Sequence, residues 1–77
     1  MIKTNYKLEE ITEALDELII EDISFVKEDE DNWHFESLFE DFKVSKSNTA
    51  VFFRTKETAA YAGTNGQSGW KYNFRLM

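Results

Sequence analysis

The sequence contains no cysteine and only three glycines, all of which lie between positions 63 and 69. Without cysteine, neither disulfides nor thiolate metal sites can compensate for a small core. No apolar run approaches the roughly 20 residues that a membrane-spanning helix needs, and Met1–Lys7 includes no apolar targeting segment. We therefore expect a cytoplasmic protein that does not enter a membrane and whose core is self-sufficient or is completed by a partner.

Positive charge is scarce in the first half of the chain. Residues 1–41 carry fourteen acidic side chains against three lysines, a net charge of −11, whereas residues 42–77 sum to +5 and leave −6 in total. Fields of this size steer association and select partners, but they perform no chemistry. The charge pattern therefore predicts a binding function.

Groups that could carry out catalysis are also few. His34 is the only histidine, there is no cysteine, and no serine motif is present, so we expect no catalytic residue and no enzyme activity. The acids Asp31 and Glu36 lie close to His34 in the sequence and are most simply its solvated neighbours. The histidine is interpreted as a surface or half-buried side chain.

Two short patterns resemble ligand sites only superficially. Asp29 and Asp31 match two positions of a calcium-binding loop, but Trp33 stands at the next ligand position and His34 at the position that needs glycine. The evenly spaced glycines at 63, 66 and 69 are followed neither by Gly-Lys-Ser/Thr nor by a helix. We predict no metal site and no cofactor, and we interpret the glycines as a plain loop.

The length and the aromatic content predict one folded domain over residues 1–77. Seven Phe, three Tyr and two Trp are too many for a disordered acidic tail. A domain of this size buries only about 60% of its unfolded surface, so the aromatic residues are needed in the core.

Leu8, Ile11, Leu15, Leu18 and Ile19 recur at steps of three and four, with acids between them. This spacing predicts an amphipathic helix over about residues 7–22, which Thr4 or Asn5 could cap. Apart from Lys7 its outer face is acidic, and like charges at i,i+4 each cost a few tenths of a kcal/mol.

Phe35, Leu38, Phe39 and Phe42 follow the helical spacing i, i+3, i+4, i+7. We expect a second short helix over residues 32–43, with the preceding acids at its N-terminus. A strand is the alternative, because residues 33–36 also alternate between apolar and polar.

The remaining segments predict strands. Residues 49–55 are β-branched and aromatic, and in residues 70–76 the side chains alternate, with Trp70, Tyr72, Phe74 and Leu76 on one face. Residues 44–46 could add a strand, with Ser47 and Asn48 as its turn. Residues 56–63 are compatible with a short helix capped by Thr55 and closed by Gly63, and alternatively residues 58–62 could form a strand that pairs with residues 70–75.

The predicted fold class is α+β: an acidic N-terminal helix, a second short helix, and an antiparallel sheet of three or four strands that packs on the helices. The predicted core consists of Leu8, Ile11, Leu15, Leu18, Ile19, Phe25, Phe35, Leu38, Phe39, Val51, Phe53, Trp70, Tyr72, Phe74 and Leu76.

The acidic surface predicts a non-catalytic protein that occupies a basic, nucleic-acid-binding site on a partner protein and inhibits it. Ordinary protein surfaces mix both signs of charge, and this one lacks the lysines that would neutralise it. The simpler reading is that the acids only confer solubility. The predicted partner-binding residues are Glu9, Glu13, Asp16, Glu17, Glu28, Asp29, Glu30, Asp31, Glu36, Glu40 and Asp41.

The alternative is a module that binds nucleic acid directly, or that forms a homo-oligomer, through the basic face of the C-terminal sheet. Its candidate residues are Phe52, Arg54, Lys71 and Arg75, which could stack on bases and hold phosphates. A net charge of −6 opposes direct nucleic-acid binding.

Overall fold

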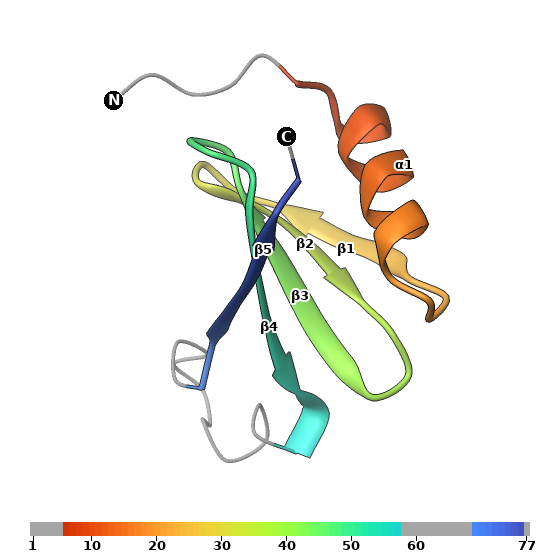
Figure 1. The fold of residues 1–77 in the computed structure, drawn as a ribbon. Coiled ribbons are helices and arrows are strands. Elements are labelled where there is room, and N and C mark those ends of the chain that lie inside the picture. The colour runs from red at the N-terminus through yellow and green to blue at the C-terminus, as the bar shows by residue number, and fades with distance from the viewer. Residues whose placement is uncertain (1–5, 58–68, 77) are drawn as a thin grey trace.

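Helix α1 covers one face of an antiparallel sheet whose five strands lie side by side in chain order (Figure 1). This computed structural model describes residues 6–57 and 69–76. The predicted α+β class is confirmed, but the sheet has five strands rather than three or four. The elements are α1 Leu8–Leu18, β1 Ser24–Glu28, β2 Asn32–Glu36, β3 Glu40–Ser45, β4 Ala50–Thr55 and β5 Lys71–Arg75.

Helix α1 forms as the sequence predicts, although it ends four residues earlier. Ile11, Leu15 and Ile19 are buried against the sheet, as expected for apolar residues spaced by four. The side chain of Glu10 accepts a hydrogen bond from the Lys7 backbone N–H at 3.0 Å, which satisfies one donor at the start of the helix. Ile19 has extended backbone angles (φ −106°, ψ 123°) and ends the helix.

The predicted second helix is wrong, and the alternative of a strand over residues 33–36 is correct. Strands β2 and β3 form a hairpin in which Phe35 lies directly opposite Phe42. Leu38 and Phe39 lie between the two strands and are largely exposed. A separation of seven residues puts two side chains on one helix face, but it also places them opposite each other when a turn lies midway. The spacing of Phe35 and Phe42 is therefore compatible with both a helix and a hairpin. In the hairpin, the buried pair of Trp33 and Val44 lies on the same sheet face as the pair of Phe35 and Phe42.

A β-bulge divides the apolar face predicted for β5. Val51 pairs with Phe74, whereas Phe52 pairs with Tyr72, so Asn73 is an extra residue in β5. Because an extra residue reverses the alternation, Phe74 lies on the helix-covered face and Tyr72 on the opposite face. The prediction that Trp70, Tyr72, Phe74 and Leu76 share one face is therefore wrong.

The remaining strand predictions agree closely with the structure. Strand β4 covers residues 50–55 of the predicted 49–55, and Val44 belongs to β3. Ser47 and Asn48 lie in the turn that follows, where the Asn48 side chain accepts a hydrogen bond from the Ala50 backbone N–H at 3.0 Å. The two alternatives for residues 56–63 depend on residues 58–63, which lie outside the described residues, as do Thr4 and Asn5.

The core lies between α1 and the sheet, and the sequence predicted about half of it. Among the predicted members, Ile11, Leu15, Ile19, Phe35 and Val51 are buried, and Leu8, Phe53, Phe74 and Leu76 pack against them. Trp33, Phe42 and Val44 are buried although they were not predicted. The predictions were wrong for Leu18, Phe25, Leu38, Phe39 and Tyr72, which are exposed. The prediction was also wrong for Trp70, whose ring contacts Lys43 and Arg54 outside the core cluster.

Candidate functional site

Four of the predicted partner-binding carboxylates lie on helix α1. Glu9, Glu13, Asp16 and Glu17 are exposed, on the side of the helix opposite the buried stripe. Within the described part of the chain, none of the four forms an ion pair, and the last turn of α1 has no basic residue. We call these four residues the helix carboxylates. They form a surface of one charge sign.

Two acids at the β1–β2 turn, Glu28 at the end of β1 and Asp29 directly after it, have structural roles. One oxygen of Asp29 accepts hydrogen bonds from the backbone N–H groups of Asp31 and Asn32 at 2.9 and 2.8 Å, and the other lies 2.7 Å from His34 Nε2. Burial would raise the pKa of Asp29, but the hydrogen bonds with His34 and with the backbone lower it to about 2. Glu28 pairs with Lys46 at 2.5 Å.

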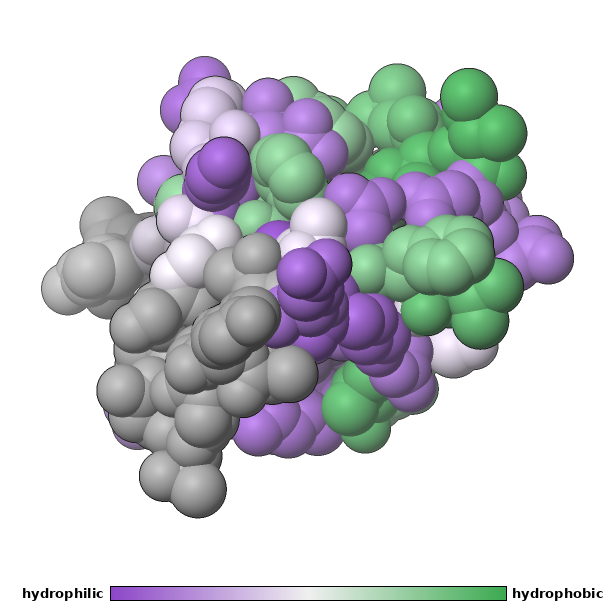
Figure 2. Space-filling view, turned by 90° about the horizontal axis from the view of Figure 1, so that it is seen from below, coloured by the Kyte–Doolittle hydropathy of each residue, from purple (hydrophilic) through white to green (hydrophobic). Residues whose placement is uncertain are grey.

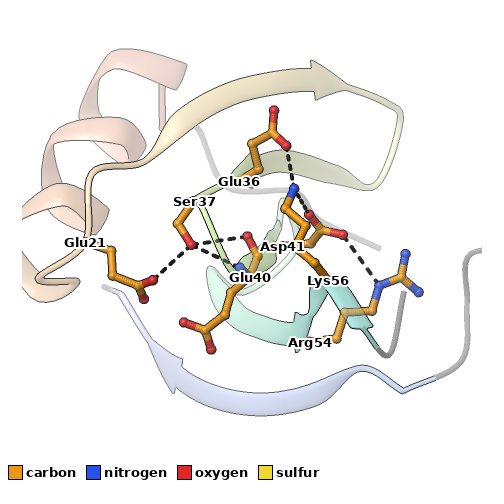
Figure 3. Close-up of polar contacts among 7 residues, drawn as sticks. All are labelled: Glu21, Glu36, Ser37, Glu40, Asp41, Arg54 and Lys56. Carbon is orange, nitrogen blue, oxygen red and sulfur yellow. Dashed lines mark hydrogen bonds and ion pairs between the residues drawn. The ribbon is translucent and has the colours of Figure 1, made fainter. Parts of the chain in front are cut away.

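Two acids of the β2–β3 hairpin share a lysine, as Figure 3 shows. Glu36 and Asp41 lie opposite each other in the register, and Lys56 Nζ lies 2.5 Å from the first carboxylate and 2.7 Å from the second. Hydrogen bonds with Asp41 and Glu36 raise the pKa of Lys56. Arg54 adds a longer contact, with its Nε 3.9 Å from Asp41. The lysine thus offsets the repulsion between two like charges on neighbouring strands.

A second acidic pair lies at the same end of the sheet. The Ser37 hydroxyl donates a hydrogen bond to Glu21 at 3.1 Å and accepts one from the Glu40 backbone N–H at 3.1 Å (Figure 3). A hydrogen bond with Glu21 raises the pKa of the Glu40 carboxyl, and burial and the charge of Glu21 act in the same direction. This cluster joins the segment after α1 to the β2–β3 loop.

Eight of the eleven predicted acids fall into two groups of four. The helix carboxylates face solvent together, whereas Glu28, Asp29, Glu36 and Asp41 are engaged with the protein's own cationic or histidine side chains. Glu40 belongs to the Ser37 cluster, and the remaining two predicted residues, Glu30 and Asp31, lie in the exposed β1–β2 turn.

The sheet face that α1 leaves uncovered carries aromatic and cationic side chains from β3, β4 and β5. Lys43 Nζ lies 4.7 Å from the centre of the Trp70 ring and 5.6 Å from that of Phe52, and Arg54 lies 4.4 Å from Trp70. Tyr72 contacts Phe52 edge to face, with the ring centres 5.9 Å apart. Burial lowers the pKa of Lys43, and the charge of Arg54 lowers it further.

These contacts weigh against the predicted nucleic-acid face. Arg54 lies between Asp41 and Trp70, and its side chain is only 10% exposed, which leaves little of the guanidinium for a phosphate. Lys71 pairs with Phe53 and so lies on the helix-covered side, whereas Phe52 and Arg75 lie on the opposite side. The four residues do not form one continuous surface.

Sequence reasoning missed the residues that organise the outer sheet face. The predicted second helix includes Lys43, and the predicted core includes Trp70. The alternation of Phe42, Lys43 and Val44 was a signal for a strand with an outward lysine, but the helical spacing of the phenylalanines outweighed it.

Comparison with known proteins yields no match to a protein family, a curated protein or a solved structure. No helix among residues 6–57 and 69–76 is long and apolar enough to cross a membrane. The same residues contain no group of three or more His, Cys, Asp or Glu side chains that could hold a metal ion.

Proposed function

We propose that this is a non-catalytic binding protein of the cytoplasm that places the helix carboxylates in a basic, nucleic-acid-binding site of a partner protein and thereby inhibits it. The observation that carries the proposal is the contrast between the two groups of acids. Glu28, Asp29, Glu36 and Asp41 stabilise the fold through internal contacts, whereas the helix carboxylates have no such role in the described structure.

The spacing of the helix carboxylates supports competition with phosphates. Glu9 and Glu17 are eight residues apart, which on a helix that rises 1.5 Å per residue corresponds to about 12 Å. One strand of duplex DNA carries a charge about every 3.4 Å of axis, so four charges along about 12 Å are close to its linear charge density. A groove of Lys and Arg that binds a phosphate strand would therefore accept this helix.

The cost of the helix carboxylates to the fold also favours a binding role. Acids at i,i+4 such as Glu9–Glu13 and Glu13–Glu17 repel each other by a few tenths of a kcal/mol per pair. A lysine at one of these positions would stabilise the helix and leave the domain soluble.

The test compares two variants that change the net charge equally. Glu13→Gln/Asp16→Asn/Glu17→Gln neutralises three of the four helix carboxylates, and Ser24→Lys/Glu57→Gln/Asn73→Lys makes the same change of +3 at exposed positions on other segments. Each tagged protein is mixed with the heparin-binding fraction of a cell lysate. The affinity of a retained partner is then measured at several salt concentrations, with a DNA duplex as competitor.

We expect the helix variant to bind about tenfold more weakly and with a shallower salt dependence, because each lost contact contributes about 0.5 kcal/mol. The matched control should bind the partner as tightly as the wild type does. The DNA duplex should displace both the wild type and the control from the partner. Equal affinity of the helix variant and the control, or a duplex that does not compete, would refute the proposal.

A further inference from the structure

Four large apolar side chains are exposed at one end of the molecule. Leu18 and Ile20, at and just after the end of α1, are 57% and 104% exposed, and Leu38 and Phe39 in the β2–β3 loop are 79% and 69% exposed. We call these four residues the apolar end. Exposed aliphatic and aromatic side chains gathered in this way on a small domain mark an interaction site more often than a plain surface.

A hydrogen bond between side chains holds the two halves of the apolar end together. Ser37 Oγ donates to Glu21 at 3.1 Å, so the segment after Ile20 and the residue before Leu38 are joined. The Lys56 backbone N–H donates to the Phe39 carbonyl at 2.8 Å and fixes the other side of the loop. Figure 2, which views the molecule from below, shows hydrophobic side chains gathered on one side with hydrophilic residues between them.

Acidic residues border the apolar end. Glu17 and Asp22 flank Leu18 and Ile20 along the chain, and Glu21 and Glu40 lie at the Ser37 hydrogen bonds. A second copy of this chain would bring the same acids against these in a two-fold contact, and like charges placed together disfavour such a dimer. The charges complement a partner whose apolar side chains are flanked by lysine or arginine.

We infer that the apolar end, with its acidic border, is the hydrophobic anchor of a protein interface and receives large apolar side chains from a partner segment rich in Lys and Arg. This inference rests on the proposed function and specifies the partner's chemistry: the helix carboxylates contact a basic surface, and the apolar end contacts apolar residues within it. Buried apolar residues near the centre of an interface contribute most of its affinity, and charges around them direct association.

The test uses two labelled synthetic peptides of eighteen residues, one of alternating Lys and Leu blocks that forms an amphipathic helix and one in which Ser replaces every Leu. Fluorescence anisotropy measures their affinity for the wild type, for Ile20→Ser/Phe39→Ser, and for the matched control Val26→Ser/Tyr72→Ser. The control also removes two exposed apolar side chains, but from the sheet. Because all four positions are exposed, circular dichroism should show the wild-type fold for every variant.

We expect the wild type to bind the Lys/Leu peptide at least tenfold more tightly than the Lys/Ser peptide. Ile20→Ser/Phe39→Ser should abolish this preference and leave the affinity for the Lys/Ser peptide unchanged, whereas the control keeps the preference. Equal binding of the two peptides by the wild type, or a preference that survives in Ile20→Ser/Phe39→Ser, would overturn the inference. So would a wild-type dimer on a sizing column that this variant converts to a monomer, because a second copy would then cover the apolar end.

The two proposals fail in different ways. If Glu13→Gln/Asp16→Asn/Glu17→Gln binds the Lys/Ser peptide as tightly as the wild type does, the proposed role of the helix carboxylates fails. If that variant binds the Lys/Ser peptide more weakly than the wild type does, but the wild type binds the Lys/Leu and Lys/Ser peptides equally well, only the inference about the apolar end fails.

Discussion

Lys56 bridges two acids that would otherwise face each other across the β2–β3 hairpin, so its removal should destabilise the protein through both. The change is Lys56→Met, which keeps the length of the side chain and removes the charge. Lys56 Nζ lies 2.5 Å from Glu36 and 2.7 Å from Asp41, and these two acids are directly opposite in the register.

The expected cost follows from these contacts. The Lys56 side chain is 38% exposed, so solvent screening limits each ion pair to about 0.5 kcal/mol. Leaving Glu36 and Asp41 opposite each other adds up to about 1 kcal/mol of repulsion. Lys56→Met should therefore lower the free energy of unfolding by about 1–2 kcal/mol, which for a domain of this size lowers the Tm by roughly 5–15 °C.

A double-mutant cycle isolates the part of the cost that depends on Asp41, namely its ion pair with Lys56 and its repulsion with Glu36. In the background of Asp41→Asn only the pair with Glu36 remains, so Lys56→Met should then cost about 0.5 kcal/mol. The matched control is Lys27→Met, at a lysine for which no ion pair is found among the described residues. It should change the stability by less than about 0.5 kcal/mol.

The assay is urea unfolding followed by circular dichroism at pH 7 in low and high salt, repeated at alkaline pH. Since the folded state raises the pKa of Lys56 above 10.5, its contribution is complete below that pH and is lost as the pH rises through the raised value. If the costs of Lys56→Met in the wild-type and Asp41→Asn backgrounds differ by no more than the roughly 0.5 kcal/mol of the lost Asp41 ion pair, the proposed relief of repulsion is refuted.

Three further predictions concern the hairpin and its turns. Phe35→Ala should cost about 3–5 kcal/mol, whereas Leu38→Ala should cost less than about 0.5 kcal/mol, as measured by thermal melting; similar costs would favour the helix that the sequence predicted. Asp29→Ala should lower the free energy of unfolding by about 1 kcal/mol at pH 7, and Asp29→Asn by less, because asparagine keeps the acceptor for the two backbone N–H groups. Since the pKa of Asp29 is lowered to about 2, the stabilisation by its charge should be lost as the pH falls through that value. A cost of Asp29→Ala that stays constant down to pH 2 would contradict this. Because the pKa of Glu40 is raised beside Glu21, the free energy of unfolding should fall as the pH rises through this raised pKa, and Glu40→Gln should remove the dependence. A pH profile of urea unfolding that Glu40→Gln leaves unchanged would show that the two carboxyls do not interact.

Strong local patterns in the sequence were sufficient for some elements. The steps of three and four that link Leu8, Ile11 and Leu15 predicted helix α1, because residues three apart share one side of a helix but lie on opposite faces of a strand. The β-branched and aromatic residues of β4 predicted a strand within one residue of its observed bounds. In both cases the preferences of the backbone and the burial of one face agree.

Local patterns did not decide between a helix and the β2–β3 hairpin, and they gave no sign of the bulge in β5. The separation of Phe35 and Phe42 suits a helix face and a cross-strand pair equally, and only the neighbouring strands β1 and β4 make the extended form favourable. The bulge at Asn73 reverses a regular alternation without any sequence signal, since asparagine is not required at such a position.

By itself, the sequence determined the α+β class, the helix, the uneven distribution of charge and the shortage of catalytic groups, because these depend on composition and on contacts between near neighbours. The tertiary structure alone decided which acids remain available for a partner. Whether a carboxylate meets a lysine fifteen or twenty residues away, as Asp41 and Glu36 meet Lys56, depends on strand register, and register depends on how all five strands fit together.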